Sequence, residues 1–337
     1  MNKYTKLGVS ALCGSLAAVS AANAGDLSVS GGVDMSWISL PKAETGNPIG
    51  IGSNYTLSGS GELDNGWNVA LSIVATNRMA YSTTNVTVTV PSMGDLIITQ
   101  GGTGKGIDRM DDVTPNVWEE AYGTGLSNGI QTVNGSTTGA GIEWTPNMMP
   151  DGLTARLYYS PDVTGAATAE KAGSGSAVNS GSSGYDVTLV ADSSITGMEG
   201  LTIGGGYASF DRSQSAQNDA SDTTVYATYA IGGFTVGYQW SEADLGTTTG
   251  AQQYDNDGYG ITFAVNDDLS IGYNHYESEQ DNGTAANVTS EATSIQVAYS
   301  MGGASVRLAS SDGDNMAYQT AASGDRDMTV LSVSLAF

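Results

Sequence analysis

Short segments in which apolar and polar residues alternate recur along most of this chain. From Trp67 to Ile73, for example, Trp, Val, Leu and Ile alternate with Asn, Ala and Ser. The final segment, Met328 to Phe337, alternates in a similar way, contains no charged residue and ends on an aromatic side chain. Because successive side chains of a β-strand point to opposite faces, each segment predicts a strand with one apolar and one polar face.

Tight turns and long polar stretches separate the predicted strands in alternation. Asp64-Asn65-Gly66 marks one of the tight turns, since Asn-Gly readily adopts the positive φ that a two-residue hairpin needs. Odd-numbered strands are expected to lead into long loops and even-numbered strands into short turns, up to a total of about sixteen. An even number of strands joined in this way predicts an all-β fold, a closed antiparallel barrel with both termini at the short-turn end.

The two faces of these strands favour a transmembrane barrel over a water-soluble β-sandwich or solenoid. The polar face carries Ser, Thr, Asn and Gly rather than the Lys and Glu of a solvated sheet. Aromatic residues gather near strand ends, as two interfacial girdles require: Trp37, Trp67, Trp144, Tyr159, Tyr207, Phe234, Trp240 and Phe337. We therefore expect a membrane barrel whose short turns are periplasmic and whose long loops lie outside the cell.

The N-terminus has the composition of a secretory signal peptide. Lys3 and Lys6 precede an apolar run rich in small residues, and Ala22-Asn23-Ala24 provides a cleavage site. The sequence therefore predicts a signal peptide over residues 1–24 and a barrel domain over residues 25–337. Cys13 is the single cysteine and lies in the signal peptide, so the exported chain would have neither disulfides nor cysteine metal sites.

The charge balance of the chain is strongly acidic. It has 35 Asp and Glu residues against 11 Lys and Arg residues, which gives a formal net charge of −24 at pH 7. A chain of this charge repels the phosphate backbones of DNA and RNA. Nucleic acids are therefore excluded as partners.

Three stretches of the chain resemble Gram-negative general porins. They are the hairpin Gly59 to Ile73, the segment Met93 to Gly101, and the C-terminal Leu335-Ala336-Phe337. The resemblance implies a homotrimer of sixteen-stranded barrels in outer-membrane lipid, with the third external loop folded into the lumen. Residues 101–136 follow the fifth predicted strand, where that constriction loop belongs, although they depart from the best-known loop motif of the enterobacterial porins.

Charged residues predict how such a pore would be lined. With the apolar positions facing lipid, the arginines of the predicted strands fall on the lumen side, and the loop supplies carboxylates. The candidates are Arg78, Arg156, Arg307 and Arg326 on the wall and Asp108, Asp111, Asp112, Glu119 and Glu120 on the loop. An arginine facing lipid near the midplane would cost about 2–4 kcal/mol, which favours the lumen side.

Two interpretations of these arginines remain open. Basic wall residues opposite an acidic loop would create a transverse electric field across a narrow passage, which admits small polar solutes and disfavours apolar ones. Alternatively, some of the arginines pair with wall carboxylates such as Glu62, Glu143 or Asp186.

Two further patterns bear on chemistry. Asp108, Asp111 and Asp112 place hard oxygen ligands on one loop and form a calcium candidate, although they lack EF-hand spacing, and a hydrated acidic rim is the alternative. His275, the one histidine, has outward parity at the loop end of a strand, so it fits an interfacial girdle better than a catalytic triad. We therefore expect no enzymatic activity and no cofactor apart from that structural calcium.

The sequence thus predicts a water-filled outer-membrane channel for passive diffusion of small hydrophilic solutes and ions, with a preference for cations because of its acidic mouth. One alternative is a porin selective for a single solute class. A sugar-selective pore would show a ladder of lumen aromatics, and only scattered ones such as Tyr158 and Tyr276 have lumen parity. The other alternative is a non-conducting barrel that acts as an anchor or adhesin, which would have a plugged lumen.

Overall fold

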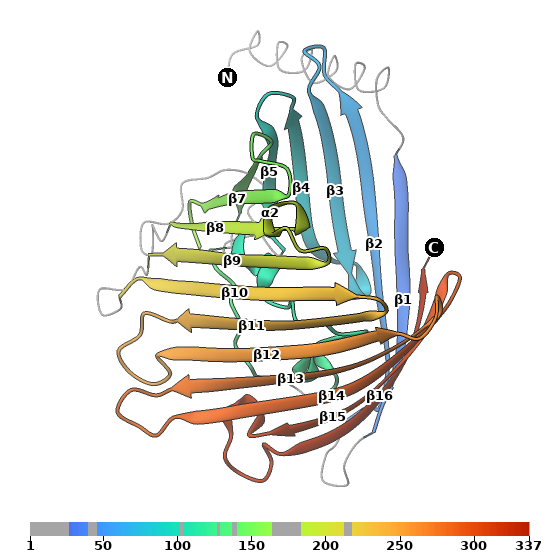
Figure 1. Ribbon diagram of the computed structural model, residues 1–337, viewed down its shortest axis with the longest axis vertical. Coiled ribbons are helices and arrows are strands. Elements are labelled where there is room, and N and C mark those ends of the chain that lie inside the picture. Colours follow the sequence, from blue (N-terminus) through green and yellow to red (C-terminus); the bar gives the residue numbers. More distant parts are fainter. Residues whose placement is uncertain are drawn as a thin grey trace, which may run out of the picture.

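The computed structural model describes residues 27–39, 46–101, 104–126, 129–136, 140–163, 183–211 and 218–336. Sixteen antiparallel strands form one closed barrel (Figure 1), as the sequence predicts. The strands are β1 (Ser28–Ile38), β2 (Ile49–Glu62), β3 (Asn68–Thr76), β4 (Ala80–Val90), β5 (Gly94–Gln100), β6 (Gly141–Pro146), β7 (Leu153–Ser160), β8 (Gly184–Ala191), β9 (Leu201–Phe210), β10 (Ala220–Ile231), β11 (Phe234–Asp244), β12 (Gln253–Ala264), β13 (Leu269–Asp281), β14 (Val288–Met301), β15 (Ala304–Asp314) and β16 (Arg326–Ala336).

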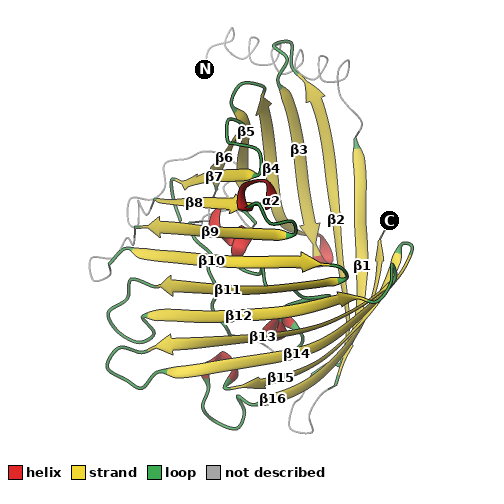
Figure 2. Ribbon diagram, in the orientation of Figure 1, coloured by secondary structure: helices red, strands yellow, loops and turns green. Residues whose placement is uncertain are grey.

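Short helical segments lie between some of these strands, and Figure 2 shows them in red. They are η1 (Asn77–Met79), η2 (Gly106–Met110), η3 (Ala121–Gly123), α2 (Ser193–Thr196) and η4 (Met316–Tyr318). Among the described residues, no helix has the length and apolar character needed to cross a lipid bilayer.

The barrel closes between β1 and β16. Gly32 lies opposite Ala336, and Ile38 lies opposite Val330, in an antiparallel ladder. The alternating C-terminal segment is therefore a wall strand, as predicted. A closed ladder leaves no unpaired strand edge, which a β-structure in a lipid bilayer requires. Phe337 and the predicted signal peptide of residues 1–24 lie outside the described residues.

The two faces of the wall have the composition that the alternation predicts. On β12, Asn256 and Gly258 are buried toward the lumen, whereas Tyr259 and Ile261 point outward and are exposed. His275 on β13 also lies on the outward face and stacks on Tyr259, with ring centroids 4.9 Å apart. This position agrees with its predicted place in an aromatic girdle.

The connections confirm most of the predicted alternation between turns and loops. The Asn65-Gly66 turn joins β2 to β3, with Gly66 at φ +80° and its N–H donating to the Leu63 carbonyl at 2.8 Å. The prediction is wrong for β3, which leads into the short segment η1 and not into a long loop. We call the end of the barrel opposite the Asn65-Gly66 turn, where long loops follow most of the odd-numbered strands, the long-loop end.

The outward face of β12 to β15 carries a row of like charges near the long-loop end. Asp257 lies directly opposite Glu277, Glu277 opposite Glu291, and Glu291 opposite Asp314. All four side chains are exposed. Carboxylates directly opposite one another in a sheet repel, so this acidic row costs the barrel stability.

Candidate functional site: the pore constriction

The connection between β5 and β6 folds into the barrel and packs against the inside of its wall. We call its described part, residues 104–126 and 129–136, the lumen loop. Ile107, Ala121, Leu126 and Val133 are fully buried although they belong to a connecting segment. In Figure 1, η2 and η3 of the lumen loop lie within the ring of strands. This position confirms that the fifth strand is followed by an infolded loop.

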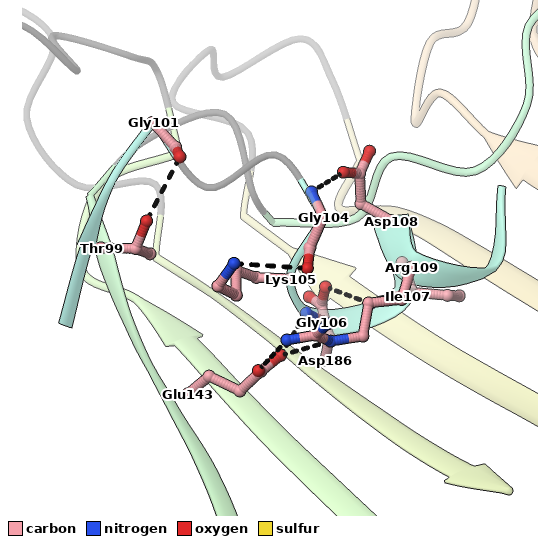
Figure 3. A network of polar contacts seen from close by, with 10 residues as sticks. All are labelled: Thr99, Gly101, Gly104, Lys105, Gly106, Ile107, Asp108, Arg109, Glu143 and Asp186. Atoms are coloured by element: carbon pink, nitrogen blue, oxygen red, sulfur yellow. Dashed lines mark hydrogen bonds and ion pairs between the residues drawn. The ribbon is translucent and has the colours of Figure 1, made fainter. Parts of the chain in front are cut away.

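Both ends of the lumen loop are fixed to the same carboxylate on the wall. Asp186 of β8 accepts from the Ile107 N–H at 3.0 Å with one oxygen and from the Ser136 N–H at 3.1 Å with the other. Nearby, Glu143 of β6 accepts from the Gly106 N–H at 2.7 Å and forms an ion pair with Arg109 (Figure 3). These contacts fix where the loop enters and leaves the wall.

Buried amide side chains hold the first part of the lumen loop, residues 104–126, which we call the outgoing limb. Gln239 of β11 accepts from the Val113 N–H at 3.3 Å and donates to the Met110 carbonyl. Gln296 of β14 accepts from the Trp118 N–H at 3.1 Å. Both glutamines are fully buried, and hydrogen bonds made in this setting are costly to break because the freed backbone groups would stay unsatisfied.

Glycines on the lumen face make room for the same limb. A Cβ at Gly237 would lie 2.6 Å from Pro115 Cδ, and a Cβ at Gly260 would overlap the Pro115 carbonyl oxygen. Gly237 and Gly260 lie directly opposite each other on β11 and β12. The wall therefore has a groove of glycine backbone where the loop approaches most closely.

The second part of the lumen loop, residues 129–136, is the returning limb, and it lies against the same strands nearer the long-loop end. Asn256 of β12 donates to the Gln131 carbonyl at 3.0 Å, and Asp222 of β10 accepts from the Gly135 N–H at 2.6 Å. At the far tip of the loop, Arg326 donates to the Leu126 carbonyl at 3.0 Å. The lumen loop is thus a two-limbed shelf held from β6 to β16.

Carboxylates of the shelf line a cavity of about 460 Å³ between its limbs. Asp111, Asp112, Glu119 and Glu120 belong to the outgoing limb, and Gln131 and its neighbours in the returning limb complete the lining. Burial and the nearby Asp112 and Asp108 charges raise the pKa of Asp111 to about 8. Burial, together with the hydrogen bond and charge of Glu119, raises the pKa of Glu120 to about 9. At pH 7 the Asp111 and Glu120 side chains are therefore mainly protonated.

The other predicted loop carboxylate, Asp108, sits deeper in the shelf. It belongs to η2, is buried and accepts from the Gly104 N–H (Figure 3). Burial raises its pKa. In the described part of the chain no group of three or more His, Cys, Asp or Glu side chains has the geometry of a metal site. The calcium site at Asp108, Asp111 and Asp112 therefore gains no support and stays a prediction.

The lumen faces of β1 to β5 carry mainly small polar residues, together with the carboxylates of Asp34 and Asp95. A hollow of about 260 Å³ in this part of the wall is lined mainly by hydroxyl and amide side chains and small residues, namely Ser28, Ser58, Gly59, Ser60, Ala70, Leu71, Ser72, Asn85 and Thr87. We call these faces the small-residue wall. We call the lumen loop with its carboxylates the acidic shelf. The acidic shelf and the small-residue wall are different surfaces of one lumen.

Comparison with known proteins agrees with this architecture. Residues 8–304 match the family model described as Gram-negative porin. The chain belongs to the Gram-negative porin family. None of the curated proteins compared with it matches.

Solved structures show the same fold at low sequence identity. A loop-deletion variant of OmpT, an outer membrane protein of Vibrio cholerae, superposes with a TM-score of 0.65 at 12% identity, covering 93% of this chain and 99% of that one. Salmonella typhi OmpF in complex with daunomycin gives 0.65 at 12% identity, with 93% and 98% covered. A mutant of the Rh. blastica porin gives 0.56 at 15% identity, with 93% and 100% covered. Family and fold together indicate an outer-membrane channel.

The four predicted wall arginines of this porin lie in three different settings. Arg156 lies opposite Thr188, and Arg307 opposite Ser332; both partners are fully buried, so these two arginines are on the lumen face. Arg326 begins β16 and holds the tip of the lumen loop. Placing Arg78 on a strand was wrong, because it lies in η1, exposed and at φ 60°. Whether any of them governs permeation stays a prediction.

The ion pairs of the described residues follow the alternative interpretation more closely than the transverse field. Glu143 pairs with Arg109 of the lumen loop, and Arg307 pairs with Asp34 of β1. Asp34 and the wall amides Gln239 and Gln296 were missed by the sequence analysis. The signal that could have revealed the amides is a series of Gly, Asn and Gln at lumen positions of consecutive strands, which becomes visible once the strand register is known.

Proposed function

We propose that this porin forms a water-filled channel for passive diffusion of small hydrophilic solutes across the outer membrane, and that the channel prefers cations. The observation that carries the proposal is the cavity lined by Asp111, Asp112, Glu119 and Glu120 on a loop docked inside the lumen. The carboxylates of this surface that are ionised raise the local concentration of cations beside a water-filled passage and lower that of anions. Their number grows as Asp111 and Glu120, whose pKa values are raised, lose their protons at higher pH. The small-residue wall adds hydroxyl and amide groups that can hydrogen-bond hydrated solutes.

The test is electrical. Residues 25–337, refolded in detergent and inserted into a planar bilayer, should give stepwise single-channel currents. Under a KCl gradient, the reversal potential should have the sign expected for a cation-preferring pore. Inserted barrels with full β-content and no current would overturn the channel and support the anchor or adhesin. Open channels without cation preference would overturn the selectivity alone.

The proposal extends to assembly, which the resemblance to general porins supports, and to export, which the composition of residues 1–24 supports. The barrel is proposed to be a homotrimer, and light scattering in detergent should give three times the mass of one chain after correction for bound detergent. Export is proposed to remove residues 1–24, so N-terminal sequencing of the outer-membrane form should begin at Gly25. A monomer, or a retained N-terminus, would contradict these extensions without affecting the channel itself.

A further inference from the structure

Arg307, on the lumen face of β15, interacts with three groups through an ion pair, a hydrogen bond and a cation–π contact. Its guanidinium forms an ion pair with Asp34 of β1 and donates to the Ser332 hydroxyl of β16 at 2.8 Å. The Ser332 hydroxyl in turn lies 2.9 and 3.0 Å from the two Asp34 oxygens. The aromatic ring of Trp118 covers the guanidinium, with the Arg307 Cζ 5.0 Å from the ring centroid.

This cluster joins the two surfaces of the lumen. Trp118 belongs to the acidic shelf and precedes Glu119, whereas Asp34 belongs to the small-residue wall. The Asp34 and Arg307 side chains are 40% and 21% exposed, and both border a hollow of about 490 Å³ lined also by Asn54 and glycines of β1 and β2. The pair therefore faces the water of the lumen, where permeating ions pass.

We infer that Asp34 is a specificity-determining residue of this channel, because it neutralises the arginine that would otherwise oppose the acidic shelf. An unpaired Arg307 would place a positive charge beside Trp118 and Glu119, where it would attract anions and offset the carboxylates. Paired with Asp34, it contributes little net field, so the shelf carboxylates set the preference for cations. The inference rests on the proposed function, since it concerns the selectivity of the same channel.

The charge of Arg307 matters over a short range. Charges separated by more than a Debye length, about 8–10 Å at physiological to moderate ionic strength, are largely screened. The Arg307 Cζ lies 5.0 Å from the ring centroid of Trp118, the residue that precedes Glu119, so its charge lies within one Debye length of this part of the loop. By contrast, Arg109 is paired with Glu143 at the opposite end of the shelf. Arg307 is thus well placed to change the preference of the pore if its partner is lost.

Selectivity measurements on four variants test the inference. Asp34→Asn removes the partner and exposes the arginine, so the K⁺/Cl⁻ permeability ratio should fall by about twofold or more, as expected for unmasking a unit charge in a watery pore. Asp34→Glu keeps the charge and should retain the wild-type ratio. Arg307→Met leaves Asp34 unpaired and should raise the ratio. The double variant Asp34→Asn/Arg307→Met removes both charges and should return close to wild type.

Asp95→Asn is the matched control, because it also replaces a wall aspartate, one that is held by Thr89 at 2.6 Å instead of by an arginine. A fall of equal size in Asp95→Asn and Asp34→Asn would overturn the inference, since Asp34 would then act as one more negative charge. A double variant as weakly selective as Asp34→Asn would overturn it too, because the effect would not pass through Arg307. Circular dichroism and heat-dependent gel mobility identify any variant that fails to fold. A wild-type barrel that does not conduct would instead refute the proposed function.

Discussion

The loop-bearing wall and the small-residue wall of this barrel follow the same alternation but are built for different neighbours. On the loop-bearing wall, from β6 to β16, the lumen positions hold glycines, buried amides and carboxylates that contact a protein segment. On the small-residue wall, from β1 to β5, they hold Ser, Thr and Asn around a hollow. A lumen position that must receive a backbone needs either no side chain or one with a matching hydrogen bond, whereas a position facing water needs only to be small and polar.

The largest effect is expected from filling the glycine groove. Gly260→Ala places a methyl group where the Pro115 carbonyl lies, so the outgoing limb must move away from the wall. Overpacking of this kind costs about 1–3 kcal/mol. We expect a larger single-channel conductance, a lower preference for cations and a lower free energy of unfolding.

Gly59→Ala is the control for this substitution, because it adds the same methyl group to a strand at a position that faces outward, opposite Leu71. The Cβ of residue 59 would meet only Leu27 Cδ1, at the ordinary contact distance of 3.9 Å. Conductance and denaturant midpoint should therefore stay near the wild-type values. If Gly260→Ala behaves like Gly59→Ala, the outgoing limb is not seated on β12.

The effect on conductance should be smaller when the ends of the lumen loop are released, although the cost in stability is at least as large. Asp186→Ala leaves the N–H groups of Ile107 and Ser136 without their acceptor, at a cost of about 1–3 kcal/mol for each buried group. Lys105 and Arg109 lie next to this anchor, so trypsin should cleave the loop faster in the folded barrel. Asp151→Ala, in the exposed β6–β7 turn, should leave the cleavage rate unchanged. Equal rates in the two variants would show that Asp186 does not hold the loop.

A change of pH should alter the loop-bearing side of the lumen in particular. The pKa values of Asp111 and Glu120 are raised to about 8 and about 9, so both side chains gain negative charge as the pH rises from 7 to 10. The preference for cations should therefore increase over that range. Asp111→Asn combined with Glu120→Gln should flatten the increase, and an equally steep profile in that variant would place the titrating groups elsewhere.

The same pKa shifts have a consequence for stability with a definite sign. In the unfolded chain these carboxyls ionise near pH 4, whereas in the folded shelf they keep their protons to higher pH. Their contribution to stability is therefore complete below about pH 4 and is lost as the pH rises toward 8 and 9. Docking of the lumen loop should therefore weaken as the pH rises over that interval. The measurement is the rate of trypsin cleavage of the folded barrel.

The wall of the barrel could be predicted from the sequence because strand alternation is a local property. The face of the sheet on which each residue between Trp67 and Ile73 lies follows from the alternation with its immediate neighbours. The Asn65-Gly66 turn is likewise encoded by the residues that form it. The beginning of a strand is harder to predict where the alternation is irregular. For example, β2 begins at Ile49, well before the alternation at Tyr55 becomes evident.

The contacts of the lumen could not be predicted, because they join residues that are far apart in the sequence. The pairing of Arg307 with Asp34 depends on closure of the barrel between β1 and β16, and nothing near either residue encodes it. The misplacement of Arg78 has a similar cause, since a turn as short as η1 does not interrupt the alternation enough to be recognised. The acidic loop itself was found because it is a long break in a regular pattern.

The smallest predicted effect lies on the outside of the loop-bearing wall. Glu277 faces Asp257 on one side and Glu291 on the other, so its charge is repelled from both neighbouring strands. Glu277→Gln should raise the free energy of unfolding by about 0.2–1 kcal/mol, the usual range for a cross-strand pair. The gain should shrink as salt is added, because screening already weakens the repulsion in the wild-type protein.

Glu62→Gln makes the same chemical change on the other side of the barrel. Glu62 lies opposite Asn68, so on that side its charge meets a neutral partner, and its removal should change stability much less. A gain in Glu277→Gln that exceeds the change in Glu62→Gln at low salt, and converges with it at high salt, would assign the cost to the acidic row. Equal changes at all salt concentrations would mean that loop-bearing strands tolerate opposed carboxylates without penalty. The contrast between the walls would then be confined to their lumen faces.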